Sequence, residues 1–189
     1  DSERPPQDHG PDARKVLVRV ADAVLRDAAQ PIAFDWGEGV LMTGMMRAHE
    51  ITGDARYRDF VRRWADSWKE RGIARLLAEK GYCGHWGPAL PLLLLDAHDG
   101  GGTYRDLVGQ VVAYAVERAE RTKDAGLSHF RGKVQLWADT LYMACPVLCR
   151  AEAALSRPGL RAEASRQLEV FARRLRDESS GLWRHMYDE

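Results

Sequence analysis

An internal repeat of about fifty residues constrains the fold of this chain more than any other feature. Residues 57–61 (Tyr-Arg-Asp-Phe-Val) are echoed 47 residues later by residues 104–108 (Tyr-Arg-Asp-Leu-Val). Trp36, Trp86 and Trp137 recur at spacings of 50 and 51 residues, each followed by Gly or Ala. A fixed period of this length predicts one supersecondary unit that is used repeatedly.

The hydrophobic pattern indicates that this unit is a helical hairpin. Apolar residues at i, i+3, i+4 and i+7 mark helices with one buried face around residues 13–28, 60–68, 107–116 and 168–175. Between them, helical segments with almost no polar face lie around residues 40–48, 90–95 and 141–148. A helix that is apolar on every side is surrounded by protein. The alternation therefore predicts outer and inner helices in turn.

This order predicts an all-α protein with one domain of stacked hairpins over residues 13–189. Residues 1–12 are polar and contain Pro5, Pro6 and Pro11, so we expect a loose leader there. The turns at 52–54 and 99–102 contain glycines that end inner helices.

Composition excludes several classes of partner. The chain has 28 Lys and Arg residues and 28 Asp and Glu residues, so it lacks the excess of positive charge that is typical of proteins that bind nucleic acid. The longest apolar run, residues 90–95, is too short to cross a membrane, and no signal peptide is visible. We therefore expect a cytoplasmic protein that binds neither nucleic acid nor membrane. Cys83, Cys145 and Cys149 are too few for a disulfide framework, and buried free thiols are expected.

The inner helices run in the same direction, so their N-termini gather on one face. The segments that meet there are residues 34–38, 81–88 and 136–140, each containing a tryptophan. An aromatic-lined mouth with a few polar groups is typical of a small-ligand site. The alternative is that each tryptophan is a packing element repeated with the hairpin.

Asp139 is the strongest candidate for chemistry because it lies between Trp137 and the first turn of an apolar helix. Enclosure among apolar groups helps a carboxyl to keep its proton, as a general acid requires. The alternative is a helix N-cap, in which the carboxylate accepts backbone N–H groups.

Two histidines, His129 and His185, follow helix breaks and are candidates for binding a substrate, although a lone histidine is more often a surface or packing residue. Cys83 and His85 invite a metal interpretation. Two ligands at i, i+2 do not make a zinc site without two more, so no metal is expected. No phosphate loop or dinucleotide fingerprint is present, so no organic cofactor is expected either.

Several blocks of sequence resemble glycoside hydrolase families 88 and 105, the unsaturated glucuronyl and rhamnogalacturonyl hydrolases. The most specific is Trp-Ala-Asp-Thr-Leu-Tyr-Met at 137–143. The others are residues 35–40, the Thr-Gly-Asp turn at 52–54, and Gly-Leu-Trp-Arg-His at 181–185. Their order and spacing are similar to those of the family over most of residues 13–189.

The resemblance implies an (α/α)6 barrel, of which about half is present. It also implies an oligosaccharide substrate that ends in a Δ4,5-unsaturated uronic acid and is cleaved by hydration of the vinyl-ether double bond. Asp139 matches the proton donor of the family. The resemblance and the mouth together give the expected substrate-binding residues: Trp36, His85, Trp86, His129, Trp137 and His185. Family members usually carry a second aspartate in the segment that reads 81–88 here, and His85 or Trp86 would replace its binding role.

Six hairpins of about fifty residues need about 300 residues, and this chain contains three and a half. We therefore expect a domain truncated at its C-terminus, or a partner chain or dimer that completes the ring. Two other functions stay open at this point. One is a non-catalytic half-toroid that binds another chain, and the other is a zinc enzyme on a similar toroid that uses Cys83 and His85.

Overall fold

The computed structural model describes residues 10–189 and confirms the all-α class. The helices are α1 (Gly10–Asp27), α2 (Trp36–Thr52), α3 (Ala55–Arg71), α4 (Ala74–Lys80), α5 (Ala89–Asp99), α6 (Arg105–Glu117), α7 (Thr140–Ala154) and α8 (Leu160–Leu175), with a 3-10 turn at Cys83–His85. Helix α1 begins at Gly10, three residues before the expected boundary. The rest of the expected leader, residues 1–9, lies outside the described residues.

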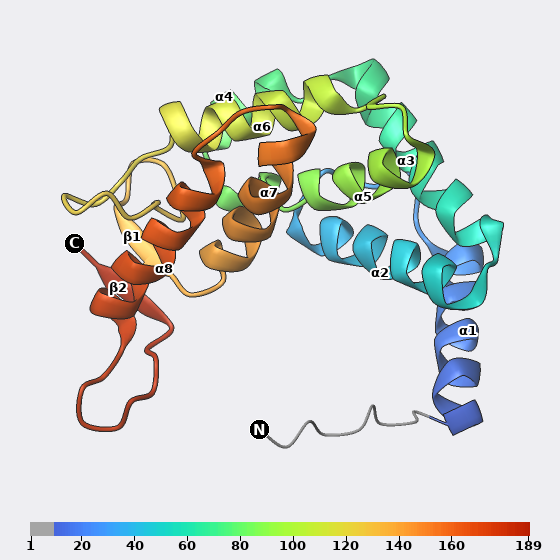
Figure 1. Cartoon of the computed structure of the whole chain (residues 1–189), viewed down its shortest axis with the longest axis horizontal. Coiled ribbons are helices and arrows are strands. Elements are labelled where there is room, and N and C mark those ends of the chain that lie inside the picture. Colours follow the sequence, from blue (N-terminus) through green and yellow to red (C-terminus); the bar gives the residue numbers. More distant parts are fainter. Residues whose placement is uncertain (1–9) are drawn as a thin grey trace.

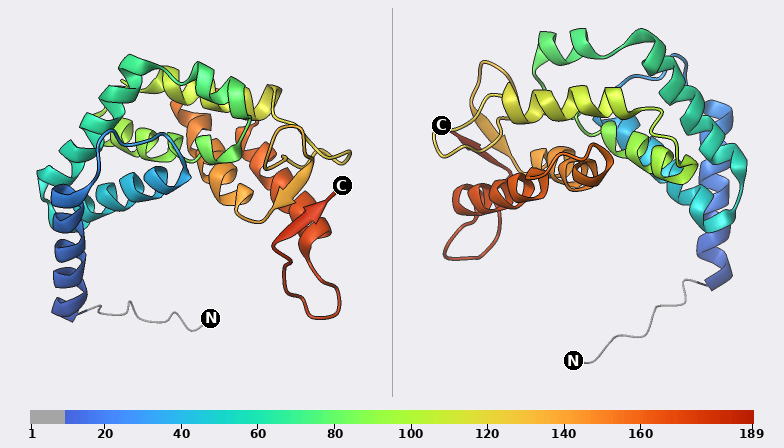
Figure 2. Two further views of the ribbon diagram at one scale, coloured as in Figure 1. Left: turned by 180° about the vertical axis from the view of Figure 1, so that it is seen from behind. Right: turned by 45° about the horizontal axis from the view of Figure 1, so that its top comes forward.

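The helices form an open arc (Figure 1), in which α2, α5 and α7 are the inner helices. Helix α5 packs against α2 on one side and α7 on the other, while α3, α6 and α8 pack outside α2, α5 and α7 respectively. Helices α1 and α8 lie at the two ends of the arc in every view (Figure 2). This is the predicted order of outer and inner helices, and it gives part of a helical toroid.

Burial explains why two kinds of helix alternate. In the inner helix α5 every residue from Ala89 to Leu95 is buried, since neighbouring helices cover all its sides. The outer helix α3 instead buries one face, which contains Tyr57, Phe60, Val61, Trp64 and Ala65. Burial of such apolar surface contributes about 25 cal/mol per Å² to folding. No helix within residues 10–189 has the length and apolarity needed to cross a membrane.

Glycines end the inner helices as the turn sequences predict. Gly53 follows α2 in the left-handed conformation, with φ of 77°, and its N–H donates to the His49 carbonyl. Asp54 then caps α3, because its carboxylate accepts a 2.9 Å hydrogen bond from the Arg56 N–H. The sharp reversal brings α3 back against α2.

A feature that the sequence pattern did not predict is a two-stranded antiparallel sheet. Strand β1 (Gln135–Trp137) pairs with β2 (Met186–Asp188), and Leu136 lies opposite Tyr187. Leu136 is buried in a small cluster with Val170 and Phe171 of α8. The sheet therefore holds the end of the described chain beside the segment that leads into α7.

Candidate active site

The N-terminal ends of the inner helices meet as predicted. Trp36 begins α2, Trp86 comes just before α5, and Trp137 ends β1 just before α7. Helix α2 approaches the α5 segment very closely at Gly39, where an added Cβ would lie 2.9 Å from the Pro88 nitrogen. The two segments therefore form one continuous surface beside α7.

Asp139 stands at the N-terminus of α7 but does not cap it. Its side chain accepts no capping hydrogen bond. The Oδ1 atom is buried without a hydrogen-bond partner and lies 4.0 Å from the His129 Nδ1. The side chain as a whole is 42% exposed, so the described helices shelter it only partly, and less than the sequence interpretation expected. The fold thus leaves this carboxyl available for another role.

His129 is the most constrained group beside Asp139. Its Nδ1 lies 2.9 Å from the Thr140 hydroxyl and 3.1 Å from the Cys83 sulfur. Its ring stacks on Trp137 with centroids 4.8 Å apart. Burial lowers the pKa of His129, and the neighbouring Asp139 carboxylate opposes that shift only in part. The imidazole is therefore held neutral in one orientation.

Aromatic rings surround this histidine. Tyr82 stacks on Phe130 at 5.5 Å and meets His129 edge-on at 5.2 Å. The Trp137 indole donates to the Gln135 side-chain oxygen at 3.1 Å, which fixes the ring. His185 is exposed and lies edge-on to Trp137 at 5.2 Å, because its carbonyl accepts the Ala138 N–H at 2.9 Å. The structure thus brings together Asp139, His129, Trp137 and His185.

Of the other three expected substrate contacts, only Trp36 lies at the surface of the mouth. Trp86 is 1% exposed and His85 is 2% exposed, so both are behind the mouth rather than on its surface. The 3-10 turn directs them inward, where Trp86 packs near Tyr114 and His85 near Tyr82. Trp36 is half-exposed at the start of α2.

Asp35 supplies a second carboxylate that the sequence interpretation did not single out. Its Oδ1 accepts the Trp36 N–H at 2.7 Å and would lie 2.8 Å from a Cβ added at Gly84. Burial raises the pKa of Tyr82 to about 12 and that of Cys83 to about 12, and the carboxylates of Asp35 and Asp139 add to both shifts. An aspartate before a helix looks like an ordinary N-cap in sequence, so only its place against the 82–85 turn reveals the proximity.

The match to a protein family covers nearly the whole described chain. The sequence model of Glycosyl Hydrolase Family 88 matches residues 13–189. The chain belongs to this family. The residues that form the site all lie within the matched range.

Solved structures share the fold of this family 88 chain. A possible member of glycoside hydrolase family 105 from Salmonella enterica serovar Paratyphi A superposes with a TM-score of 0.78 at 22% identity, covering 98% of this chain and 54% of its own. One from Klebsiella pneumoniae gives 0.79 at 22%, with the same coverage. A family 105 glycoside hydrolase from C. acetobutylicum gives 0.78 at 21%, covering 93% of this chain and 49% of its own. The chain thus spans about half the length of these structures. No curated protein matches it.

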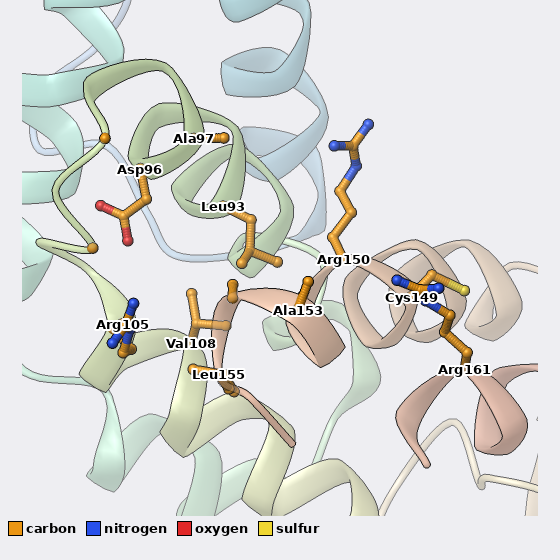
Figure 3. A pocket seen from close by; sticks show the side chains of 13 residues that line it. Leu93, Asp96, Ala97, Arg105, Val108, Cys149, Arg150, Ala153, Leu155 and Arg161 are labelled. Atoms are coloured by element: carbon orange, nitrogen blue, oxygen red, sulfur yellow. The ribbon is translucent and has the colours of Figure 1, made fainter. Parts of the chain in front are cut away.

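An open cavity of the family 88 chain lies at the opposite ends of the inner helices. Its volume is about 570 Å³, and residues of α5, α6 and α7 line it, among them Leu93, Asp96 and Arg105 (Figure 3). The Asp96 carboxylate accepts the Tyr104 N–H at 3.1 Å, so it serves the turn into α6. None of the mouth residues lines this cavity, and it offers no group placed like Asp139.

The zinc alternative needs more ligands than the mouth provides. Within residues 10–189, no group of three or more His, Cys, Asp or Glu side chains could hold a metal ion. Cys83 is fully buried, and its sulfur contacts His129 and Thr140 instead.

Proposed function

We propose that this family 88 chain belongs to a glycoside hydrolase that removes a Δ4,5-unsaturated uronic acid from the end of an oligosaccharide by hydration. The observation that carries the proposal is the Asp139 carboxyl. One of its oxygens is buried without a hydrogen-bond partner, 4.0 Å from a neutral histidine and at the start of an inner helix. A carboxyl that does not stabilise its own helix is available to exchange a proton with a ligand.

The proposed reaction needs one carboxyl group and no metal or organic cofactor. The protonated Asp139 gives its proton to C4 of the double bond, and the positive charge that forms at C5 is shared with the ring oxygen. Water adds to C5 and returns one proton to the carboxylate. The resulting hemiketal opens, and the attached sugar leaves from C1. Glycosidases that displace the leaving group directly use a pair of carboxyl groups instead.

The neighbouring side chains have complementary roles in this proposal. His129 is a positioning residue, because the contacts of its Nδ1 with Thr140 and Cys83 fix the ring that faces Asp139. Trp137 offers an aromatic surface for a sugar ring, and the exposed His185 at its edge is available for a carboxylate or hydroxyl. Trp36 is a further aromatic contact at the start of α2.

Loss of the ultraviolet absorbance of an unsaturated uronyl disaccharide tests the proposal. We expect no decrease in absorbance with Asp139→Asn, while this variant keeps the helical circular dichroism of the unmodified chain. Asp59→Asn is a matched control, because the Asp59 side chain is 41% exposed and lies on the outer helix α3. Full activity of Asp139→Asn would contradict the role of Asp139. An equal decrease in activity in Asp139→Asn and Asp59→Asn would contradict it as well.

The open edges of the arc favour contact with further helices. Large apolar side chains are exposed on α1 and α2 at one end and on α8 at the other: Val16, Val20, Val40, Ile51 and Leu168. Val16 and Val20 lie one turn apart on α1 and so form an exposed apolar surface, and a contiguous surface of this kind marks an interaction site. Since the chain spans 54% of two related structures, we propose that further helices of the toroid cover these edges and complete the mouth.

Sedimentation of the chain alone tests this second proposal. We expect self-association that the charged double variant Val20→Glu, Ile51→Glu reduces. A monodisperse monomer whose sedimentation the two substitutions leave unchanged would contradict it. A non-catalytic interaction module remains distinguishable, because it would bind a partner and leave the unsaturated sugar intact.

A further inference from the structure

Two histidines face each other at the ends of the inner helices opposite the mouth. His49 near the end of α2 and His98 near the end of α5 place their Nε2 atoms 3.0 Å apart. Their ring centroids are 4.9 Å apart. Thirteen residues of helix separate His49 from Trp36, which corresponds to about 20 Å at 1.5 Å per residue. The pair is therefore distinct from the candidate active site.

The other ring nitrogens determine which atoms carry protons. The Nδ1 of His49 lies 2.9 Å from the Asp54 carbonyl oxygen, which can only accept a hydrogen bond. The Nδ1 of His98 lies 3.2 Å from the Asp99 carboxylate, which also accepts. Both Nδ1 atoms are thus N–H donors, and a neutral imidazole has only one N–H. The two Nε2 atoms therefore direct lone pairs toward each other.

Two lone pairs at this distance repel each other, and a cation bound between them would remove that repulsion. With metal–nitrogen bonds of about 2.0–2.1 Å, a separation of 3.0 Å corresponds to an angle of about 95° at the metal and to ring centroids about 4.7 Å apart. A proton shared along a straight line would place the centroids about 5.3 Å apart. The observed 4.9 Å lies between these two values, so the two imidazole nitrogens are close enough to bind one ion.

The surroundings are those of metal-binding histidines. Such residues donate their second N–H to a carboxylate or a backbone carbonyl, which orients the ring and makes the free nitrogen more basic. Asp99 is itself held, because Arg62 Nη2 donates to both of its oxygens at 2.8 Å. Asp54 is fixed as the N-cap of α3. Both rings are therefore oriented before any ion binds.

We propose that His49 and His98 form a two-histidine site for a divalent transition-metal ion, which ties α2 to α5 on the side opposite the mouth. No third protein ligand joins them within residues 10–189, so water completes the coordination. A structural zinc site uses four protein ligands. An angle near 90° between imidazole nitrogens is typical of tetragonal Cu²⁺ or Ni²⁺, and Cu²⁺ is the stronger binder.

Titration of the intact chain with Cu²⁺ tests the site. We expect one tightly bound ion per chain, an electron paramagnetic resonance spectrum with two nitrogen ligands, and at least a tenfold loss of affinity in His49→Gln and in His98→Gln. His185→Gln is the matched control, because it removes an exposed histidine elsewhere and should keep wild-type affinity. Wild-type affinity in either of the first two variants would overturn the proposal.

A measurement on the unmodified chain keeps the test independent of how the variants fold. Paramagnetic Cu²⁺ at a substoichiometric ratio should broaden the amide signals around residues 49–54 and 96–100 before those around residue 129. Broadening first around His129 or His185, or no selective broadening, would refute a site at the end of α2 and α5.

Discussion

The close approach of α2 to the segment before α5 leads to a specific prediction about Gly39. A Cβ added at Gly39 would lie 2.9 Å from the nitrogen, and 3.1 Å from the Cα, of Pro88. Both are backbone atoms, so a side-chain rotation cannot relieve the clash. We expect Gly39→Ala to force apart two segments that form the mouth.

The magnitude follows from two opposing effects. Overpacking a buried position costs about 1–3 kcal/mol. Alanine is a better helix former than glycine by about 0.8–1.0 kcal/mol, which offsets part of that loss. Gly44 lies in the same helix, and an added Cβ there would have no atom within 4 Å. Gly44→Ala should therefore gain the stability that comes from the higher helix propensity of alanine, without a clash. The two variants should therefore differ by about 1–3 kcal/mol, or roughly 2–12 °C in Tm.

Thermal and urea unfolding of the unmodified chain and the two variants provide the assay. The stability order should be Gly44→Ala, then the unmodified chain, then Gly39→Ala. If Gly39→Ala is as stable as Gly44→Ala, the segments do not touch as described and the geometry of the mouth is wrong.

Three further predictions concern buried ionisable groups. Because burial lowers the pKa of His129 in the folded chain, the unfolded chain binds the extra proton first as the pH falls below about 6.5. Urea unfolding should therefore show stability falling below that pH, with a shallower fall in His129→Gln; an unchanged slope would contradict it. The pKa of Cys83 is raised to about 12 and its side chain is fully buried, so a thiol reagent should modify the exposed Cys149 first and Cys83 only on unfolding. Equal modification rates in the folded chain would refute this. Glu163 is buried and pairs at 2.8 Å with the partly exposed Arg121, so Glu163→Ala should cost about 1–3 kcal/mol in urea unfolding, and a loss below 0.5 kcal/mol, roughly that of a surface substitution, would contradict it.

Periodicity carried most of the fold prediction because inner and outer helices bury different fractions of their surface. Seven long helices follow from that contrast, and their order is the observed one. The β1–β2 pairing was not predicted from the sequence, because strands of three residues are too short to show a periodic pattern. It joins residues 51 positions apart, from Leu136 to Tyr187.

The candidate site was only partly predictable for a different reason. The meeting of β1, β2 and α7 brings together four side chains: Asp139, His129, Trp137 and His185. In the sequence, each of these residues lies just after a helix break or just before a helix. Trp86 and His85 have the same sequence signal, yet a 3-10 turn directs both into the core. Sequence shows that a tryptophan precedes a helix but not which way the turn before it faces.

The central claim, that Asp139 donates a proton to a carbon atom, is tested most directly by running the reaction in D₂O. Nuclear magnetic resonance of the products from the unmodified chain should show one deuterium on C4 of the released uronic acid. The Asp139→Asn variant should form no product. Release of the neighbouring sugar with the C4–C5 double bond intact would show direct displacement at the glycosidic carbon and contradict the account.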